Sequence, residues 1–475
     1  MGEAFINQKK GLGIKLNDVI EEFRYVYKGK NIKAGDFVNY INGVASKNDY
    51  GESVNTQLSS TAYAGYTISA VELDDNRIFI THSYGSSYYL YGMVVTINGA
   101  TITMGTDTAL DTTTNSGKFI STVLLPNGNI FIAHGYVYSG MYIYGMIITV
   151  NGTTISKGTD TQIATASYTS AVCSAILLPN GNVFIAHESP SSTYLSGIVC
   201  TISGTTISKG SAIQLSTGSY TGYSISTCLL DNGAVFIAHN SSTSYHLYGI
   251  VCTISGTTIT AGSDTAIRAK YRAGQFISAV LLNGSQNSIF IAHSDDSSEV
   301  DYLYLYGTLV TVNGTTINVV VSKSLATRDT GYCVKALRLD ENRVAIFHNY
   351  NSSSFYLGGV VAVINNNSIT PTTDTQLSTT SYSGRVVQAL LLNNNTIFVA
   401  HTYNSSYYLY SQIFAIDYDN NIPTNNIVTT EYEQQVTPAI EPPFNAVALS
   451  SGVGGTDTEH NEQVKIARLP DEEVV

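Results

Sequence analysis

The chain has 475 residues, of which 23 are Lys or Arg and 35 are Asp or Glu, for a formal net charge of −12. The charged fraction of 12% is about half the usual value for a soluble domain, whereas the hydrophobic fraction of 43% is ordinary. The acidic balance argues against a nucleic-acid-binding protein, which needs a basic surface to neutralise phosphates. The longest apolar runs fall short of the ~20 residues of a membrane helix.

Residues 1–52 precede the repeats described below. They lack the apolar segment of a secretory signal, so we expect synthesis in the bacterial cytoplasm without a signal peptide. Two strand-like runs flank Lys33-Ala34-Gly35-Asp36, which predicts half of a small β module. The next segment, Val54-Asn55-Thr56-Gln57-Leu58, matches the polar outer strand of the later repeats but precedes any first strand. We therefore expect it to pair with the last repeat and close the ring.

The sequence IFIAH, with variants, recurs seven times at intervals of 52 to 55 residues. Each repeat contains an apolar run, a tight turn, IFIAH, a longer loop, a run such as YGMIITV, a second tight turn and a Thr-rich polar run. Seven units of four antiparallel strands at this period are typical of a β-propeller. The predicted fold is all-β: a seven-bladed β-propeller of four-stranded antiparallel blades over residues 53–430, plus a small β module built from residues 1–52 and 431–475.

Several residues recur in most repeats and are predicted to build the blades. One His per blade cannot bring three ligands to one zinc ion, so we expect a repeated hydrogen bond between blades from His82, His134, His187, His239, His293, His348 and His401. The recurring G-[TS]-D-T indicates turn or bulge acceptors at Asp107, Asp160, Asp264 and Asp374. The residue at the start of the third strand is also predicted to build the blade: Tyr89, Tyr142, Tyr194, His246, Tyr304, Tyr356 and Tyr408. The five cysteines are interpreted as small core residues: Cys173, Cys200, Cys228, Cys252 and Cys333.

Strand connectivity places the tight turns on one face of the propeller. The other face receives the longer loops between the second and third strands and the links between blades. These loops mix Tyr with Ser, Asn and Gly, which suits a glycan ligand, and the low overall charge favours a neutral one. The tyrosines that vary between repeats are the candidate ligand-binding residues: Tyr84, Tyr88, Tyr136, Tyr138, Tyr350, Tyr403 and Tyr407.

One loop is acidic. Asp295, Asp296, Glu299 and Asp301 supply oxygen ligands of the kind that hold Ca²⁺, but their spacing matches no defined motif, and a solvated insertion is the preferred interpretation. No cofactor and no metal are predicted beyond this weak candidate. The motifs G-x-S-x-G, H-E-x-x-H and G-x-x-x-x-G-K-[ST] are absent from the sequence, and no catalytic residue is predicted. Paired acids at glycosidase spacing remain an open alternative.

The two terminal segments carry a resemblance. The sequences AGDFVNYING (residues 34–43) and NAVALSSGVGGT…EQVKIARL (residues 445–469) resemble terminal modules of structural proteins of tailed phages and prophages of Gram-positive hosts. The seven YxYG/IFIAH units are similar to repeats of phage tail-fibre or receptor-binding proteins. The resemblance implies a place in a virion or phage-tail-like particle, and it carries over no catalytic residue.

From these observations we expect a non-enzymatic adhesin whose propeller presents its Tyr/Ser/Asn-rich loop face to a host cell-surface polysaccharide. Residues 1–52 and 431–475 would attach it, in multiple copies, to other structural proteins of the particle. Neither nucleic acid nor membrane insertion is expected. Two alternatives remain open: a purely structural virion protein, such as a capsid decoration or a baseplate or tail accessory, and an enzyme that depolymerises envelope polysaccharide.

Overall fold

The computed structural model describes residues 55–98, 101–137, 141–165, 172–189, 194–216, 218, 221–241, 245–283, 287–296, 303–326, 330–351, 353–365, 367–378, 380–392 and 396–415, together with the backbone of seven short strands nearer the termini. The chain divides into two compact units: Met1–Tyr50 with Val428–Val475, and Gly51–Ile427. The described ranges contain strands and turns, and no helix in them could cross a membrane.

The smaller unit joins strands from both ends of the chain. Its strands are β1 (Ile20–Val26), β2 (Asn31–Ile32), β3 (Phe37–Ile41), β4 (Val44–Lys47), β38 (Ala446–Ala448), β39 (Gly452–Val453) and β40 (Gln463–Arg468). Five of them close a barrel in the order β1-β4-β3-β38-β40. β1 is antiparallel to β40, and β3 is antiparallel to β38. The two terminal segments therefore share one sheet, as predicted.

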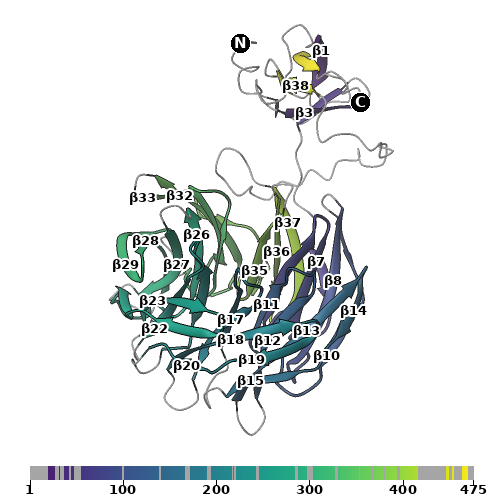
Figure 1. Cartoon of the computed structure of the whole chain (residues 1–475). Helices are drawn as coiled ribbons and strands as arrows, with labels where there is room; N and C mark the ends of the chain where they lie inside the picture. Colours follow the sequence, from purple (N-terminus) through teal and green to yellow (C-terminus); the bar gives the residue numbers. More distant parts are fainter. Residues whose placement is uncertain are drawn as a thin grey trace, which may run out of the picture. The chain divides into compact units, whose positions relative to one another are not determined.

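The larger unit is a seven-bladed β-propeller of four-stranded antiparallel blades, which confirms the predicted fold (Figure 1). Blade 1 comprises β6 (Ile68–Asp74), β7 (Arg77–Tyr84), β8 (Tyr89–Asn98), β9 (Thr101–Met104) and β10 (Thr108–Asp111). Blade 2 comprises β11 (Ile120–Leu124), β12 (Ile130–Val137), β13 (Met141–Asn151), β14 (Thr154–Lys157) and β15 (Thr161–Thr165). Blade 3 comprises β16 (Cys173–Leu177), β17 (Val183–Glu188), β18 (Leu195–Ser203), β19 (Thr206–Lys209) and β20 (Ile213–Gln214).

The remaining blades repeat this arrangement. Blade 4 comprises β21 (Ile225–Leu229), β22 (Val235–Ser241), β23 (His246–Ser255), β24 (Thr258–Ala261) and β25 (Thr265–Arg268). Blade 5 comprises β26 (Ile277–Asn283), β27 (Ser288–Asp296), β28 (Leu303–Asn313) and β29 (Thr316–Ser324). Blade 6 comprises β30 (Val334–Arg338), β31 (Arg343–Asn349), β32 (Leu357–Asn365), β33 (Ser368–Pro371) and β34 (Thr375–Gln376). Blade 7 comprises β35 (Val387–Leu391), β36 (Thr396–Tyr403), β37 (Tyr408–Ala415) and β5 (Thr56–Ser59).

The first strand of each blade is the inner one, because the first strands of successive blades contact one another around the ring, including β35 with β6. The outer strand is broken in most blades. In blade 1, β9 pairs with one half of β8 and β10 pairs with the other half. The break lies at the recurring G-[TS]-D-T sequence, which the turn interpretation anticipated.

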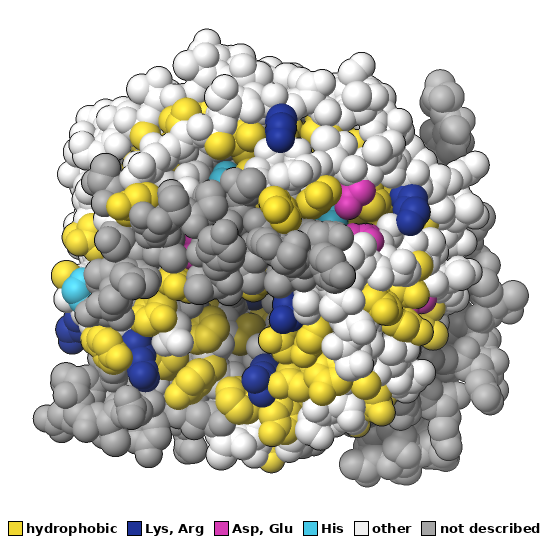
Figure 2. Space-filling view, turned by 90° about the horizontal axis from the view of Figure 1, so that it is seen from below, with side chains coloured by type: hydrophobic (Ala, Val, Ile, Leu, Met, Phe, Trp, Pro, Cys, Tyr) yellow, Lys and Arg dark blue, Asp and Glu magenta, His cyan; other side chains and the backbone are white. Residues whose placement is uncertain are grey.

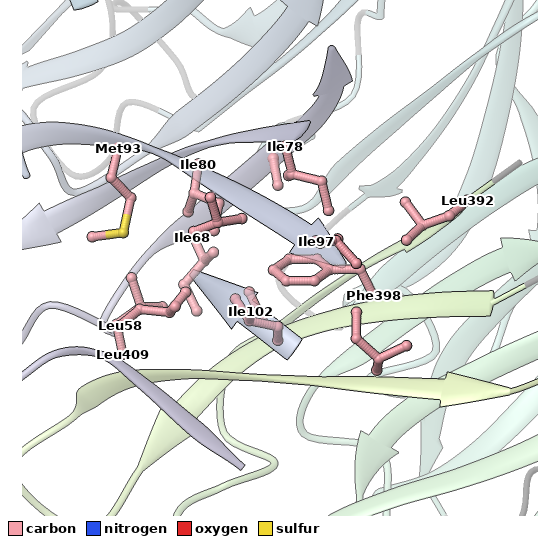
Figure 3. Close-up of a cluster of buried hydrophobic side chains, with 14 of the residues drawn as sticks. Leu58, Ile68, Ile78, Ile80, Met93, Ile97, Ile102, Leu392, Phe398 and Leu409 are labelled. Carbon is pink, nitrogen blue, oxygen red and sulfur yellow. The ribbon is translucent and has the colours of Figure 1, made fainter. Parts of the chain in front are cut away.

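The ring is closed by the segment that precedes the first repeat. β5 pairs antiparallel with β37, with Gln57 opposite Tyr410, so the predicted closure is confirmed. Leu58 of β5 and Leu409 of β37 join Ile68 and Ile80 of blade 1 in one buried cluster (Figure 3). Burial of these side chains joins the first and last blades with the hydrophobic contacts that an interior interface uses.

The IFIAH sequence forms the centre of each blade. Its Phe is fully buried in six blades, and in blade 6 a Phe two positions later is buried instead: Phe79, Phe131, Phe184, Phe236, Phe290 and Phe398, with Phe347 in blade 6. In blade 1 the Phe79 ring crosses Gly92 of β8, where a Cβ atom would lie 3.0 Å from the ring. This close approach explains why a Gly follows Tyr in the third strand of most repeats.

The cysteines lie where the sequence predicts, in apolar surroundings. All five are free, and Cys200, Cys228 and Cys252 are buried. Burial raises the pKa of these three thiols to about 12, so they remain protonated and unreactive at neutral pH.

Two repeated hydrogen bonds hold the blades, and one of them corrects a prediction. The blade histidines do not join neighbouring blades: in blade 1, His82 Nε2 of β7 lies 3.0 Å from Asp107 Oδ1 in the outer-strand break of the same blade. The bonds between blades come instead from serines of the inner strands. Ser121 Oγ accepts a bond of 2.9 Å from the backbone N–H of Ala175 in the next blade. The other acceptors are Ser69, Ser174, Ser226 and Ser278.

Candidate functional site

The face that carries the long loops also carries the links between blades. In the described residues, a link passes from an outer strand to the next inner strand and packs on the loop between the second and third strands of the preceding blade. Gly65 N–H donates to the carbonyl oxygen of Tyr407 at 2.6 Å, and Gly117 N–H donates to that of Tyr88 at 2.7 Å. A Cβ atom at Gly117 would lie 2.5 Å from the carbonyl oxygen of Tyr89. The recurring third-strand position therefore supports the link through its backbone.

Aromatic side chains gather on this face where blade 7 meets blade 1. The rings of Tyr66 and Tyr88 lie 4.6 Å apart, and those of Tyr66 and Tyr407 lie 5.7 Å apart. Tyr63 contacts both partners: its ring stacks on Tyr407 at 5.8 Å and meets the edge of Tyr88 at 5.5 Å. Tyr382 extends the group, with its ring 6.2 Å from Tyr407. We call these five tyrosines the tyrosine cluster.

The backbone holds these rings in an uncommon conformation. Tyr88 and Tyr407 have φ angles of 50° and 55°, and Tyr63 and Tyr382 both have φ of 65°. Positive φ is unusual for an aromatic residue and costs of order 1–3 kcal/mol. The same geometry recurs in equivalent loops, where Tyr245 has φ of 53°, so the repeat imposes it.

Two cations lie over the cluster. The guanidinium carbon of Arg385 is 4.9 Å from the ring centre of Tyr407, and it also lies 5.5 Å from that of Phe355. Lys118 Nζ is 5.0 Å from the ring centre of Tyr88. Arg385 is exposed and Lys118 is half-buried. Within the described residues neither forms an ion pair with a carboxylate, so both charges are available to an anion.

Figure 2 shows this face of the propeller. In Figure 1, β15 and β20, which lead toward the links, lie on the lower side, and Figure 2 is seen from below. Hydrophobic side chains, a class that includes Tyr in this colouring, gather there with several Lys and Arg side chains between them. The arrangement combines flat apolar rings with cationic groups.

Two tyrosines of the cluster, Tyr88 and Tyr407, have raised pKa values. Burial raises the pKa of Tyr88, and the neighbouring phenols Tyr66, Tyr63 and Tyr407 act in the same direction. Burial also raises the pKa of Tyr407; Arg385 opposes this effect without cancelling it. Both phenols are therefore weaker acids than free Tyr and present an O–H donor to a ligand.

The structure separates the predicted site residues. It brings Tyr88 and Tyr407 together across the closure of the ring, as described above. Tyr84 and Tyr403 instead stack within their own blades, on Tyr91 at 3.9 Å and on Tyr410 at 4.0 Å. Tyr350 is half-buried, and its backbone N–H donates to the carbonyl oxygen of Tyr356. The side chain of Tyr136 and the whole of Tyr138 lie outside the described residues.

The acidic loop of blade 5 differs from its prediction. Asp295 is buried rather than solvated and forms an ion pair with Arg268, which reaches it from the outer strand of blade 4. Its carboxylate is therefore neutralised by a protein cation. Asp296 lies at the end of β27, but its side chain is outside the described residues, as are Glu299 and Asp301.

Sequence reasoning overlooked the residue that follows the link glycine. This position precedes each inner strand, at the open end of the ring, and carries Tyr66, Lys118, Tyr223, Gln275, Tyr332 and Arg385 in the six repeats that the structure describes there. The signal was available in the recurring [AS]-G-x or T-G-x before each apolar run. The position lies in the links between blades, whereas the predicted site residues came from the loops between the second and third strands.

No family model matches the chain, and no curated protein matches it. Among solved structures, a PL25 ulvan lyase, a polysaccharide lyase determined with -[GlcA(1-4)Rha3S]- bound, is 8% identical, with a TM-score of 0.51 over 77% of this chain and 95% of its own. A protein from Lactobacillus plantarum is 13% identical, with a TM-score of 0.50 over 74% and 95%. The NanB sialidase of Streptococcus pneumoniae is 11% identical, with a TM-score of 0.44 over 63% and 68%. At these identities the likeness shows the propeller fold.

These comparisons correct the predicted function. One similar propeller with a named activity, at a TM-score of 0.51, is a polysaccharide lyase, an enzyme that acts on a glycan. The prediction of a non-enzymatic adhesin is therefore wrong, and its alternative, depolymerisation of a polysaccharide, is the better interpretation. The resemblance to phage tail proteins, the particle location and the attachment role of the terminal segments stay predictions.

Proposed function

We propose that the protein is an enzyme that depolymerises an acidic polysaccharide, with the tyrosine cluster, Lys118 and Arg385 as its substrate site. The observation that carries the proposal is the Arg385 guanidinium 4.9 Å from the Tyr407 ring centre, on a face where neighbouring phenols lie within stacking distance. A sugar ring stacks on flat aromatic faces, while a planar guanidinium binds a carboxylate or sulfate through two parallel hydrogen bonds.

The charges on this face favour an acidic glycan over a neutral one. We expected a neutral glycan because the chain as a whole is poor in charge. The site itself gathers two cations, Lys118 and Arg385, which lack carboxylate partners among the described residues. The uronate-containing ligand in the ulvan lyase structure belongs to the same chemical class.

The protonated phenols supply the second element of the proposal. Cleavage of a glycosidic bond, by hydrolysis or by elimination, requires a proton for the departing oxygen. Burial keeps the Tyr407 O–H protonated, and the charge of Arg385 beside it stabilises the phenolate that remains after proton donation. We assign it the role of proton donor, with Arg385 holding the acidic group of the adjoining sugar and Tyr66 supporting the ring.

The test uses the purified full-length protein and a panel of polysaccharides. Polyuronates, sulfated glycans and polysialic acid form the acidic arm, and neutral mannans and glucans form the other. New reducing ends report cleavage, and ultraviolet absorbance of an unsaturated uronate distinguishes elimination from hydrolysis. We expect cleavage in the acidic arm only.

A matched pair of variants connects the activity to the site. Arg385→Gln should abolish cleavage of the acidic substrate. Arg77→Gln is the control, because Arg77 lies at the tight turn of the opposite face and pairs with Asp74. Absence of cleavage for every polysaccharide, or equal activity in the two variants, would refute the proposal.

A further inference from the structure

At the interface between blades 1 and 2, three potential metal-binding side chains converge. Asp111 ends the outer strand β10 of blade 1, while His134 of β12 and Asp160 belong to blade 2. Their ligand atoms all lie within 4.8 Å of one another. Tetrahedral zinc with bonds of ~2.0–2.2 Å places its ligand atoms about 3.3–3.6 Å apart, so small side-chain shifts would bring these three atoms onto one ion.

The second carboxylate distinguishes this interface from the others in the ring. The equivalent outer-strand position carries other residues at the other interfaces that we compare. Between blades 3 and 4 it is Ser216, whose hydroxyl donates to Asp264 Oδ2 at 2.5 Å. Between blades 4 and 5 it is Arg268, which neutralises Asp295. Only between blades 1 and 2, among these compared positions, does the chain place an acid beside the His–Asp pair.

The hydrogen bonds already bring two of the converging atoms together, because His134 Nε2 lies 3.1 Å from Asp160 Oδ1, and a metal ion would take the place of the proton between them. His134 is fully buried, and its Nδ1 lies 3.1 Å from the carbonyl oxygen of Ser116. A ligating His commonly donates its other ring N–H to a carbonyl in this way, which directs Nε2 toward the metal. Asp111 Oδ1 accepts from the backbone N–H of Thr113 at 2.8 Å and from its hydroxyl at 2.7 Å.

The other carboxylate oxygen of Asp111, Oδ2, indicates a bound cation. Oδ2 is buried and accepts no hydrogen bond from the residues that the structure describes. A buried carboxylate oxygen without a donor is costly, and the cost is greater beside Asp160, which carries the same charge. A bound cation would satisfy Oδ2 and balance the two carboxylates.

We propose that this interface binds a divalent transition metal, with Zn²⁺ as the probe, through His134 Nε2, Asp160 and Asp111 Oδ2. An imidazole together with two carboxylates suits zinc or manganese better than Mg²⁺ or Ca²⁺, which prefer oxygen alone. Three protein ligands leave one tetrahedral position for water. The Asp160 side chain is 26% exposed and provides a route from solvent. The metal would join the first two blades, independently of any substrate.

The experiment measures zinc bound to the full-length protein. After removal of metal with a chelator, the protein is loaded with Zn²⁺ and dialysed, and bound metal and the melting temperature are determined. We expect about one Zn²⁺ from this site and a higher melting temperature. Asp111→Ser installs the side chain that the chain itself uses at the blade 3–4 interface, and it should remove that one equivalent and the thermal shift.

A gain-of-site variant keeps the test decisive if Asp111→Ser folds poorly. Ser216→Asp places the same three groups together at the interface of blades 3 and 4, with His239 and Asp264, and should bind one additional Zn²⁺. Equal zinc content in the wild type and Asp111→Ser would overturn the proposal.

Discussion

The Nε2 atom of His239 lies 3.0 Å from Asp264 Oδ1, while its Nδ1 lies 2.8 Å from the carbonyl oxygen of Asn240. Burial raises the pKa of Asp264, but the hydrogen bond and charge of His239 and the hydrogen bond of Ser216 outweigh it, so the net pKa lies below its ordinary value. The contact between His239 and Asp264 joins the second strand to the break in the outer strand.

Blade 3 lacks this acceptor and offers a direct test of its value. His187 Nε2 is buried without a hydrogen-bond partner in the described structure, because Ala212 occupies the position of Asp264. Ala212 is exposed, so an Asp at this position should disturb no core packing. Ala212→Asp should stabilise the propeller by about 1–3 kcal/mol, measured by denaturant unfolding. It should also raise the His187 pKa, which burial lowers; an unchanged His187 titration by NMR would contradict the pairing.

Two neutral histidines should make stability depend on pH. Burial lowers the pKa of His293 and His401 to about 4. The unfolded chain binds protons at these groups near pH 6.5 and the folded chain does not. Each His should therefore contribute its full share to the free energy of unfolding above pH 6.5. This contribution, roughly 3 kcal/mol for each His, should be lost as the pH drops toward 4.

Variants assign this pH dependence to the two residues. His401→Gln and His293→Gln should each reduce the slope of unfolding free energy against pH, between about 6 and 5, by about 1 kcal/mol per pH unit. Denaturant titrations at several pH values measure the slope. Identical slopes in the wild type and both variants would show that these histidines do not control it.

The serine bonds between inner strands should contribute to ring stability. Ser278 Oγ accepts the backbone N–H of Ala336 at 2.9 Å in a buried environment. Ser278→Ala leaves that N–H without its acceptor, and we expect a loss of about 1–3 kcal/mol in the free energy of unfolding. The exposed loop residue Ser86 is the control: Ser86→Ala should change stability by no more than about 0.5 kcal/mol. Equal effects would argue against the interblade bond.

The proposed proton donor has a kinetic signature. Tyr407→Phe keeps the ring that stacks on Tyr63 but removes the O–H, so kcat should fall by ~10²–10⁴-fold while KM changes little. Tyr407→Ala removes the ring as well and should also raise KM. Steady-state kinetics on the acidic polysaccharide that the protein cleaves separate the two effects. A kcat of Tyr407→Phe equal to that of the wild type would exclude the hydroxyl as donor.

The sequence patterns predicted the blades because each hairpin is specified by residues that are close together in the chain. An apolar run, an Asn-Gly turn and IFIAH specify a hairpin without reference to the rest of the chain. The match of Val54–Leu58 to later outer strands likewise predicted the closure that β5 makes with β37. The same reasoning failed for the histidines, because the repeat gives a position for each His but not the direction of its Nε2 atom.

The candidate site depended on proximity across the closure of the ring. Tyr66 and Tyr407 are 341 positions apart in the chain, yet their rings lie 5.7 Å apart. Arg385, Lys118 and Asp111 are unremarkable residues in their own repeats, and each also contacts a residue of a neighbouring blade: Phe355, Tyr88 and His134 respectively. The sequence by itself determined the repeat, the strand pattern and the closing strand, since these rest on hydrogen bonds and apolar periodicity within one unit. The tertiary structure alone decided which side chains meet between units, because contacts across an interface depend on how the blades pack together.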